Sequence, residues 1–254
     1  MMFLPVFAVA LLCQTATSFS IFSRTDLSVD ADFNLFILTQ WWPQTMCYDQ
    51  MTEENFKRVK MNQTKSCVPE GVTKWTIHGL WPTIGTEHKP EYCNESWPFS
   101  KSVIQDLLPK LERQWPTLES GQENAEFWKH EWDKHGTCST NISFLNSEHK
   151  YFTTTLSLNV KYDLYSILKQ SGIVPSDDAT YQVKEIQGVL FDFFRVRFRM
   201  TCYKTEGMGQ MLDSVELCLD KTDLSLIDCQ DSNPDCDFSK PVQYPPIIYP
   251  SDLV

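Results

Sequence analysis

The apolar residues of this chain fall into runs that predict strands at both ends and helices in the middle. Residues 34–42 (NLFILTQWW) are mainly apolar and predict a buried strand, and residues 74–78 (KWTIH) predict another, ended by Gly79 and Pro82. Three amphipathic segments predict helices at residues 100–114, 146–170 and 181–194. Ser100 is placed to cap the first of these, and Trp115-Pro116 to stop it.

The C-terminal third has a strand-like pattern. Residues 195–204 alternate polar and apolar side chains, Gly207-Met208-Gly209 predicts a turn, and residues 214–220 and 224–229 predict further strands. Strands at both ends with helices between them predict one α+β domain, with a central antiparallel sheet flanked by helices. Residues 240–254 contain four prolines and are expected to run extended along the surface.

The first twenty residues read as a secretory signal peptide. They carry no charge, and their apolar run from Phe3 to Leu12 is too short to span a bilayer. We expect cleavage near Ala16-Thr17-Ser18, which gives a signal at residues 1–18 and a single domain at residues 19–254. An uncleaved, buried N-terminal segment is the alternative. We expect no membrane-spanning helix.

The cysteines also indicate that the chain enters the secretory pathway. Loss of the signal removes Cys13 and leaves eight, an even number that predicts four disulfides in a secreted chain. Three N-x-[ST] sequons, at Asn62, Asn94 and Asn141, also favour the secretory pathway. No C-x-x-C pair occurs, which disfavours a zinc ribbon.

The formal charge of −11 counts against an extended surface that grips nucleic acid through its phosphates. It says less about a small cleft that holds one phosphodiester. In an acidic compartment the five histidines become cationic and the charge deficit shrinks.

The segment FWKHEWDKHGTC (residues 127–138) concentrates titratable side chains among large aromatic ones. It is close to the H-E-x-x-H helix of zinc proteases, but Lys134 stands where the second ligand belongs. His130 and His135 are five positions apart and diverge by about 140° on a helix, so they are poorly placed to share one metal. Glu131 and His135 are four apart and share a face. A solvent-exposed charged helix is the plain alternative, and the interleaved aromatics argue against it.

A second histidine completes a possible acid–base pair. His78 lies in WTIHGLWPT (residues 75–83), at the end of an apolar run. Taken alone, it is more often a packed core or loop histidine than a catalyst. Together with His135 it offers two imidazoles that titrate near pH 6.5, one to remove a proton and one to donate it.

These two segments resemble the active-site motifs of the ribonuclease T2 family, secreted and lysosomal or vacuolar acid endoribonucleases. WTIHGLWP and FWKHEWDKHGTC match without gaps and in order, and ILTQWWP (37–43) and CNESWPF (93–99) are also similar. The resemblance spans roughly residues 33–236. It implies a disulfide-stapled ribonuclease T2-like α+β fold and cleavage of single-stranded RNA without a metal or other cofactor.

The resemblance also implies a role for each residue. His135 acts as general base on the ribose 2′-OH, and His78 as general acid on the departing 5′-oxygen. Glu131 and Lys134 stabilise the transition state, and His130 binds phosphate. The first product is a 2′,3′-cyclic phosphate, and DNA, which lacks the 2′-OH, is not cleaved.

Base contacts and cysteine pairs follow from the same resemblance. Trp81 would stack on a base or flank the phosphate, while Gln40 and Phe127 would contact bases. Strand polarity and core packing explain Gln40 and Phe127 equally well. The implied disulfides are Cys47–Cys67, Cys93–Cys138, Cys202–Cys236 and Cys218–Cys229.

We therefore expect a secreted or lysosomal glycoprotein, monomeric, that acts as an acid endoribonuclease. The alternative is a secreted glycoprotein of the same fold that acts mainly in extracellular signalling or immune modulation. Intact His78, Glu131 and His135 argue against a dead enzyme but do not decide between the two.

Overall fold

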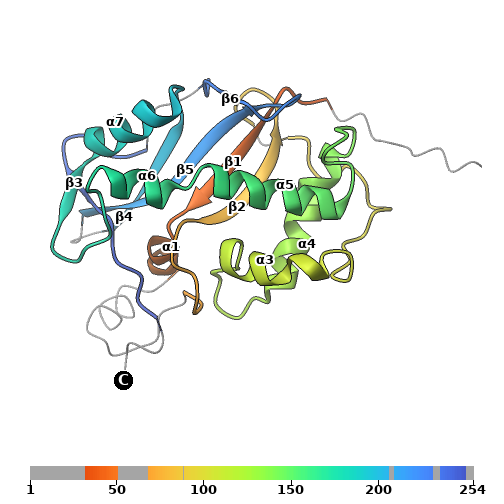
Figure 1. Ribbon diagram of the computed structural model, residues 1–254, viewed down its shortest axis with the longest axis horizontal. Coiled ribbons are helices and arrows are strands. Elements are labelled where there is room, and N and C mark those ends of the chain that lie inside the picture. Colours follow the sequence, from red (N-terminus) through yellow and green to blue (C-terminus); the bar gives the residue numbers. More distant parts are fainter. Residues whose placement is uncertain (1–31, 51–67, 88, 206–208, 231–234, 250–254) are drawn as a thin grey trace, which may run out of the picture.

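The computed structural model describes residues 32–50, 68–87, 89–205, 209–230 and 235–249. Its elements alternate only partly between strand and helix (Figure 1). In chain order they are β1 (Leu35–Trp41), α1 (Pro43–Asp49), β2 (Thr76–Thr83), a 3-10 turn η1 (Gln105–Leu107), α3 (Leu108–Gln114), α4 (Asn124–Lys134), a 3-10 turn η2 (Gly136–Ser139), α5 (Glu148–Lys161), α6 (Leu164–Gln170), β3 (Thr180–Gln182), α7 (Val183–Phe194), β4 (Arg199–Thr205), β5 (Gly209–Asp220), β6 (Leu226–Ile227) and β7 (Pro241–Gln243).

The strands form one sheet in the order β2-β1-β5-β7-β3, with β4 and β6 also paired to β5. All pairs are antiparallel except β5 with β7, which is parallel. Every residue of β1 is buried, as expected for a strand covered on both faces. Helices α5 and α6 lie across one face of the sheet (Figure 1). The predicted α+β class, with a central, mainly antiparallel sheet flanked by helices, is confirmed.

Strand β2 is longer than predicted. It continues through Gly79 and Pro82 to Thr83, and Pro82 pairs in register with Phe36. Because β2 is the end strand of the sheet order, a proline there costs no central ladder hydrogen bond. The prediction that these two residues end the strand was therefore wrong.

The predicted helix at residues 146–170 is two helices. Helix α5 ends at Lys161, and Asp163 caps α6 by accepting a hydrogen bond from the Ser166 backbone N–H. The helix predicted at residues 100–114 begins only at Leu108, with a proline in its first turn, after the short turn η1. Capping side chains and prolines thus set boundaries that the apolar spacing alone does not.

The other boundaries shift by a few residues. Helix α7 begins at Val183 because residues 180–182 pair with β7 as β3. Arg195, at φ 59°, ends α7, so strand β4 starts at Arg199 rather than at residue 195. Strand β5 extends the predicted 214–220 back to Gly209, and β6 covers only Leu226–Ile227. Residues 207 and 208 of the predicted turn lie outside the described residues.

Three predicted disulfides are confirmed: Cys93–Cys138, Cys202–Cys236 and Cys218–Cys229. Of the fourth predicted pair, Cys47 is buried in the last turn of α1, and Cys67 lies outside the described residues. The predicted signal segment 1–18 and the sequon at Asn62 also lie outside the described residues. Asn94 and Asn141 are half-buried. Of the predicted tail, residues 241–243 form β7. None of the helices in the described ranges is both long and apolar enough to cross a bilayer.

Candidate active site

The histidine of β2 is held by aromatic rings on two sides. The His78 imidazole stacks on the Trp41 indole, with ring centroids 4.0 Å apart and planes 17° apart, and meets the Trp81 ring edge-on at 4.7 Å. The backbone carbonyl of His78 accepts a hydrogen bond from Trp115 Nε1 at 2.9 Å. His78 itself is half-buried, so its ring is oriented by packing and still reaches solvent.

Helix α4 supplies the facing groups. Its start is fixed by a capping box between Glu123 and Glu126. Its buried residues are Phe127, Trp128, Glu131 and Trp132, which lie on one side of the helix. Two of the indoles also donate hydrogen bonds, Trp128 to the Trp115 carbonyl and Trp132 to the Trp97 carbonyl. The alternative of a merely solvated charged helix is therefore excluded.

Glu131 and His135 come together as their spacing predicts. His135 follows the last helical residue, and its backbone N–H donates to the Glu131 carbonyl at 3.1 Å. Both side chains are buried, with 1% and 3% of their surface exposed. Trp81 Nε1 donates to Glu131 Oε2 at 2.9 Å, and the Trp81 ring lies 5.4 Å from the His135 ring. One indole thus contacts His78, Glu131 and His135.

The Glu131 carboxyl is neutral over a wide pH range. Burial raises its pKa to about 8, against the smaller opposing effects of the Trp81 hydrogen bond and of Lys134. A neutral carboxyl carries an O–H donor as well as an acceptor oxygen. Glu131 can therefore donate a hydrogen bond in the acid and neutral range.

Gly79 makes this close approach possible. A Cβ on Gly79 would lie 2.0 Å from Trp81 Nε1 and 2.3 Å from Glu131 Oε2. A shift of either atom alone would break the hydrogen bond between them. The glycine next to His78 is therefore a requirement of the site, whereas the sequence pattern predicted Gly79 only as the end of a strand.

The cations of α4 lie on its exposed side. Partial desolvation of the ring, and next the charge of Lys134, lower the pKa of the His130 imidazole, so it becomes cationic only under acidic conditions. Lys134 Nζ is 3.3 Å from the carboxylate of Glu91. The neighbouring Tyr92 N–H donates to the Lys134 carbonyl at 2.9 Å, and the Cys93–Cys138 bridge follows. Residues 91–93 therefore fasten the end of α4.

The residues expected to contact bases divide into two groups. Phe127 lies near the histidine, 6.3 Å from the His78 ring and 6.0 Å from the Trp41 ring. Trp81 is 7% exposed and packs among the catalytic candidates rather than on an open surface. Gln40 is not brought to the site, because its amide donates to the Tyr162 carbonyl on the other face of β1.

Sequence reasoning missed Trp41 and Trp115. Trp41 follows Gln40 on β1, so it points to the opposite face and meets His78 there. The alternation of faces along a strand implies that Trp41 and the adjacent Trp42 point to opposite faces, but it does not say which of them meets His78. Trp115 is the C-cap residue of α3, and its sequence signal, the helix stop Trp115-Pro116, does not show that its indole reaches the His78 carbonyl. Within the described part of the chain, no cluster of three or more His, Cys, Asp or Glu side chains is arranged to hold a metal ion.

Comparison with known proteins decides the family. The sequence matches the ribonuclease T2 family over residues 33–229. The chain belongs to the ribonuclease T2 family. It is 36% identical to Ribonuclease Oy of Magallana gigas over 223 residues, which cover 85% of this chain and 98% of that protein.

Solved ribonuclease T2 structures have the same fold. Human RNase T2 superposes with a TM-score of 0.68 at 36% identity, over 84% of this chain and 99% of the human one. RNase NT in complex with 5′-AMP superposes with a TM-score of 0.69 at 27% identity, over 85% of this chain and 100% of that one. The resemblance drawn from the two histidine motifs is therefore confirmed for the family and the fold.

Proposed function

We propose that this ribonuclease T2 family member is an acid endoribonuclease that cleaves single-stranded RNA by internal attack of the ribose 2′-OH. The 2′-oxygen bonds to the adjacent phosphorus while the bond from phosphorus to the 5′-oxygen breaks. The products are a 2′,3′-cyclic phosphate and a 5′-hydroxyl end. The observation that carries the proposal is the pair of imidazoles, His78 and His135, packed against one indole beside a neutral carboxyl.

The two histidines divide the proton transfers. In this proposal His135 takes the proton from the 2′-OH, and His78 gives a proton to the leaving 5′-oxygen. The half-buried His78 is the more accessible of the two, which suits contact with a leaving group that must depart into solvent. His135 lies deeper, at the end of α4, where residues 91–93 and 138 fix the backbone.

Three further groups act on the phosphate charge. Neutral Glu131 donates a hydrogen bond to a nonbridging phosphate oxygen while its other oxygen accepts from Trp81. His130, cationic in acid, and Lys134 lie along α4 and supply positive charge. Lys134 is ion-paired with Glu91, so the charge that it offers to the phosphate depends on how far the phosphate displaces the Glu91 carboxylate.

Nucleotide contacts belong to the aromatic rings beside His78. Phe127 and Trp41 lie beside His78 but are only 7% and 6% exposed, so in this proposal a base contacts the exposed edges of these rings. RNase NT, a structural relative, binds 5′-AMP, which supports a nucleotide site in this fold. Gln40 has no place in this part of the proposal, because it faces the other side of β1.

The proposed destination is the secretory pathway, leading to the extracellular medium or the lysosomal lumen. The three observed disulfides suit an oxidising compartment. The sequons at Asn62, Asn94 and Asn141 and the apolar segment 1–18 suit it as well. In this proposal the chain acts as a monomer, without a cofactor.

The test is digestion of single-stranded RNA at pH 5 in the presence of EDTA. We expect cleavage to products with 2′,3′-cyclic phosphate ends, and no cleavage of a DNA strand of the same sequence. Products with only 3′-hydroxyl ends, or activity abolished by EDTA, would overturn the proposed chemistry. Absence of cleavage at every pH would favour the alternative, a signalling glycoprotein of this fold.

A further inference from the structure

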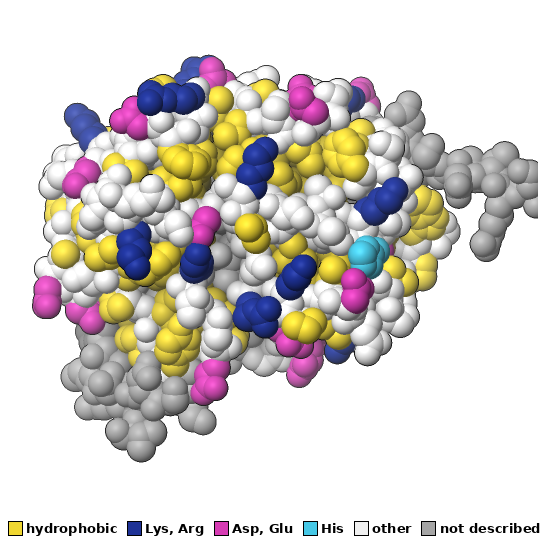
Figure 2. All heavy atoms as spheres, in the orientation of Figure 1, with side chains coloured by type: hydrophobic (Ala, Val, Ile, Leu, Met, Phe, Trp, Pro, Cys, Tyr) yellow, Lys and Arg dark blue, Asp and Glu magenta, His cyan; other side chains and the backbone are white. Residues whose placement is uncertain are grey.

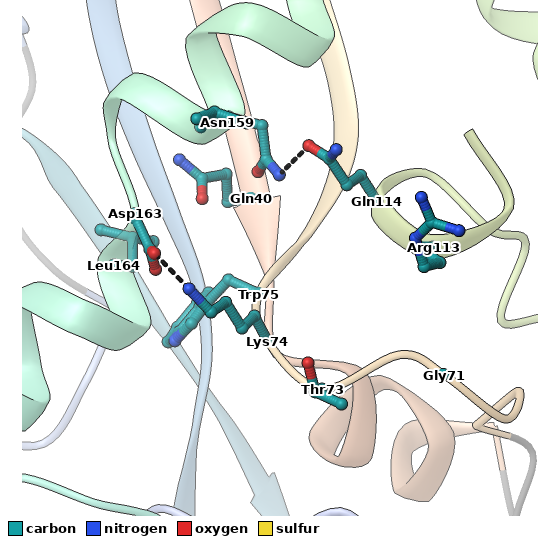
Figure 3. Close-up of a pocket in the computed structure, with 11 residues that line it drawn as sticks. Gln40, Gly71, Thr73, Lys74, Trp75, Arg113, Gln114, Asn159, Asp163 and Leu164 are labelled. Atoms are coloured by element: carbon teal, nitrogen blue, oxygen red, sulfur yellow. Dashed lines mark hydrogen bonds and ion pairs between the residues drawn. The ribbon is translucent and has the colours of Figure 1, made fainter. Parts of the chain in front are cut away.

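A pocket lies on the opposite face of β1 from His78. Its volume is about 260 Å³, and it opens between β1, the start of β2, the end of α3 and the junction of α5 and α6 (Figure 3). No step of the proposed reaction uses it. The side chains that matter here are Gln40, Lys74, Arg113, Gln114, Asn159 and Asp163.

Three side-chain amides form the inner part of this pocket. Gln40 uses its nitrogen to donate to the Tyr162 carbonyl, and Asn159 uses its nitrogen to donate to Gln114 Oε1 at 3.1 Å. Asn159 is 8% exposed, and its buried Oδ1 accepts no hydrogen bond from any described residue. A buried acceptor without a partner costs free energy, so the pocket is suited to a ligand that donates to it.

Two cations stand at the rim. Lys74 is ion-paired with Asp163, whereas exposed Arg113 forms no ion pair within the described ranges. These three charged groups sum to +1, on a chain whose formal charge is −11. The space-filling view shows Lys and Arg side chains spaced across the middle of this face (Figure 2). Guanidinium groups bind phosphate in a bidentate fashion, so Arg113 favours a phosphate-bearing ligand.

The two ends of the pocket together select the ligand. Asn and Gln amides match the mixed donors and acceptors on the edge of a nucleobase, and Arg113 matches a phosphate. The volume is slightly below the usual range for small-molecule sites, roughly 300–1,000 Å³, which limits the ligand to a single unit. We propose that this pocket binds one nucleotide, with its base on the amides of Gln40, Gln114 and Asn159 and its phosphate on Arg113.

The nucleotide has two possible sources, and both rest on the proposed function. It is either a released mononucleotide or one nucleotide of an RNA strand that continues past the histidines. The pocket adjoins the segment that supports catalysis, because Trp115, next to Gln114, holds the His78 carbonyl. An RNA strand that crosses the edge of the sheet at β2 would therefore contact both the histidines and this pocket.

The test is isothermal titration of the full chain at pH 5 with 3′-UMP and with 3′-AMP, which carry their phosphate on the 3′ side as the proposed cleavage leaves it. We expect two sites in the unaltered protein, one at the histidines and one in this pocket. Arg113→Glu should lower the nucleotide affinity of one of these two sites by about tenfold or more, as expected for loss of a charge-assisted hydrogen bond. Val160→Trp, at a residue that is 66% exposed on the pocket wall, should block the same site.

Lys110→Glu is the matched control, because it makes the same charge change on an exposed residue of α3 outside the pocket. A single nucleotide site in the unaltered protein, or equal binding by the Arg113 and Lys110 variants, would overturn the inference. A second site that persists in a protein unable to cleave RNA would overturn the proposed function alone.

Kinetics distinguish the two sources. If the pocket holds part of the strand, Arg113→Glu raises KM for long single-stranded RNA about tenfold while dinucleotide cleavage is unchanged. If it holds only released nucleotide, both KM values stay at the level of the Lys110 variant. Either result supports a nucleotide pocket, provided that the titration shows the second site.

Discussion

Trp41 lies face to face with His78 and is the residue that most directly sets the plane of that imidazole. Replacing it with Leu removes the stack but keeps an apolar side chain against the sheet. We expect kcat/KM for a dinucleotide at pH 5 to fall about fivefold, because an aromatic pair is worth roughly 1 kcal/mol beyond its buried area. Trp41→Phe should retain more activity than Trp41→Leu.

Thermal unfolding of both Trp41 variants separates this effect from a general loss of stability. Equal rates for Trp41→Leu and the unaltered protein, with the fold intact, would show that the stack does not position His78. The pairing was hidden in the sequence because Trp41 and Trp42 are adjacent. Only the register of β1 against β2 decides which of the two indoles meets the histidine.

At the scale of elements, the approach of β2 to α4 depends on Gly79. A Cβ there would overlap both Trp81 and Glu131, so Gly79→Ala forces β2 and α4 apart. We expect the free energy of unfolding to fall by about 2 kcal/mol or more, as for overpacking in a core, and cleavage to be largely lost. Urea denaturation and initial rates at pH 5 measure the two effects.

Gly188 is the matched control within helix α7. A Cβ there meets nothing within 4 Å, so Gly188→Ala should stabilise the chain by about 0.5–1 kcal/mol and leave the rate unchanged. If the two alanine variants behaved alike, crowding at Gly79 would not explain the need for glycine in the first motif.

The elements also show what the sequence could and could not predict. Apolar runs predicted β1 and the start of β2, because nearly all of their residues are buried, and regular apolar spacing predicted α7, which buries one side. The break between α5 and α6 was missed, since it depends on the Asp163 carboxylate, which accepts a capping hydrogen bond from the Ser166 backbone N–H. The histidine motifs located His78 and His135, but the burial that neutralises Glu131 arises from residues 79–81 packing on α4, which no local pattern records.

At the scale of the whole molecule, buried carboxyls make stability depend on pH. Burial raises the pKa of Glu131 to about 8, of Glu148 to about 7 and of Asp213 to about 6. Their ordinary values are 4.5, 4.5 and 3.8. The unfolded chain therefore releases these protons at lower pH than the folded one does. The stabilisation from these carboxyls is complete below their ordinary pKa values, and it is lost as the pH rises through their raised pKa values.

We expect a higher urea midpoint at pH 5 than at pH 7.5. For Glu131 alone, the free energy of unfolding falls by up to about 1.4 kcal/mol per pH unit between pH 4.5 and 8. Glu131→Gln keeps an acceptor for Trp81 but cannot ionise, so its stability should decline less steeply over that range. A midpoint that rises with pH, or an unchanged slope in Glu131→Gln, would contradict the buried neutral carboxyl.

The central claim is that His78 and His135 act as one acid–base pair. The measurement is the rate of RNA cleavage at pH 5 by His78→Ala, His135→Ala and the double variant, with His149→Ala as the control. His149 lies on α5 beside Asp106 and takes no part in the site. We expect each single change to lower the rate by about 10²–10⁴-fold. The double variant should be little slower than the slower single one, because groups that act as a unit are not additive. A double variant that cleaves RNA at the rate of the His149 control would contradict the account.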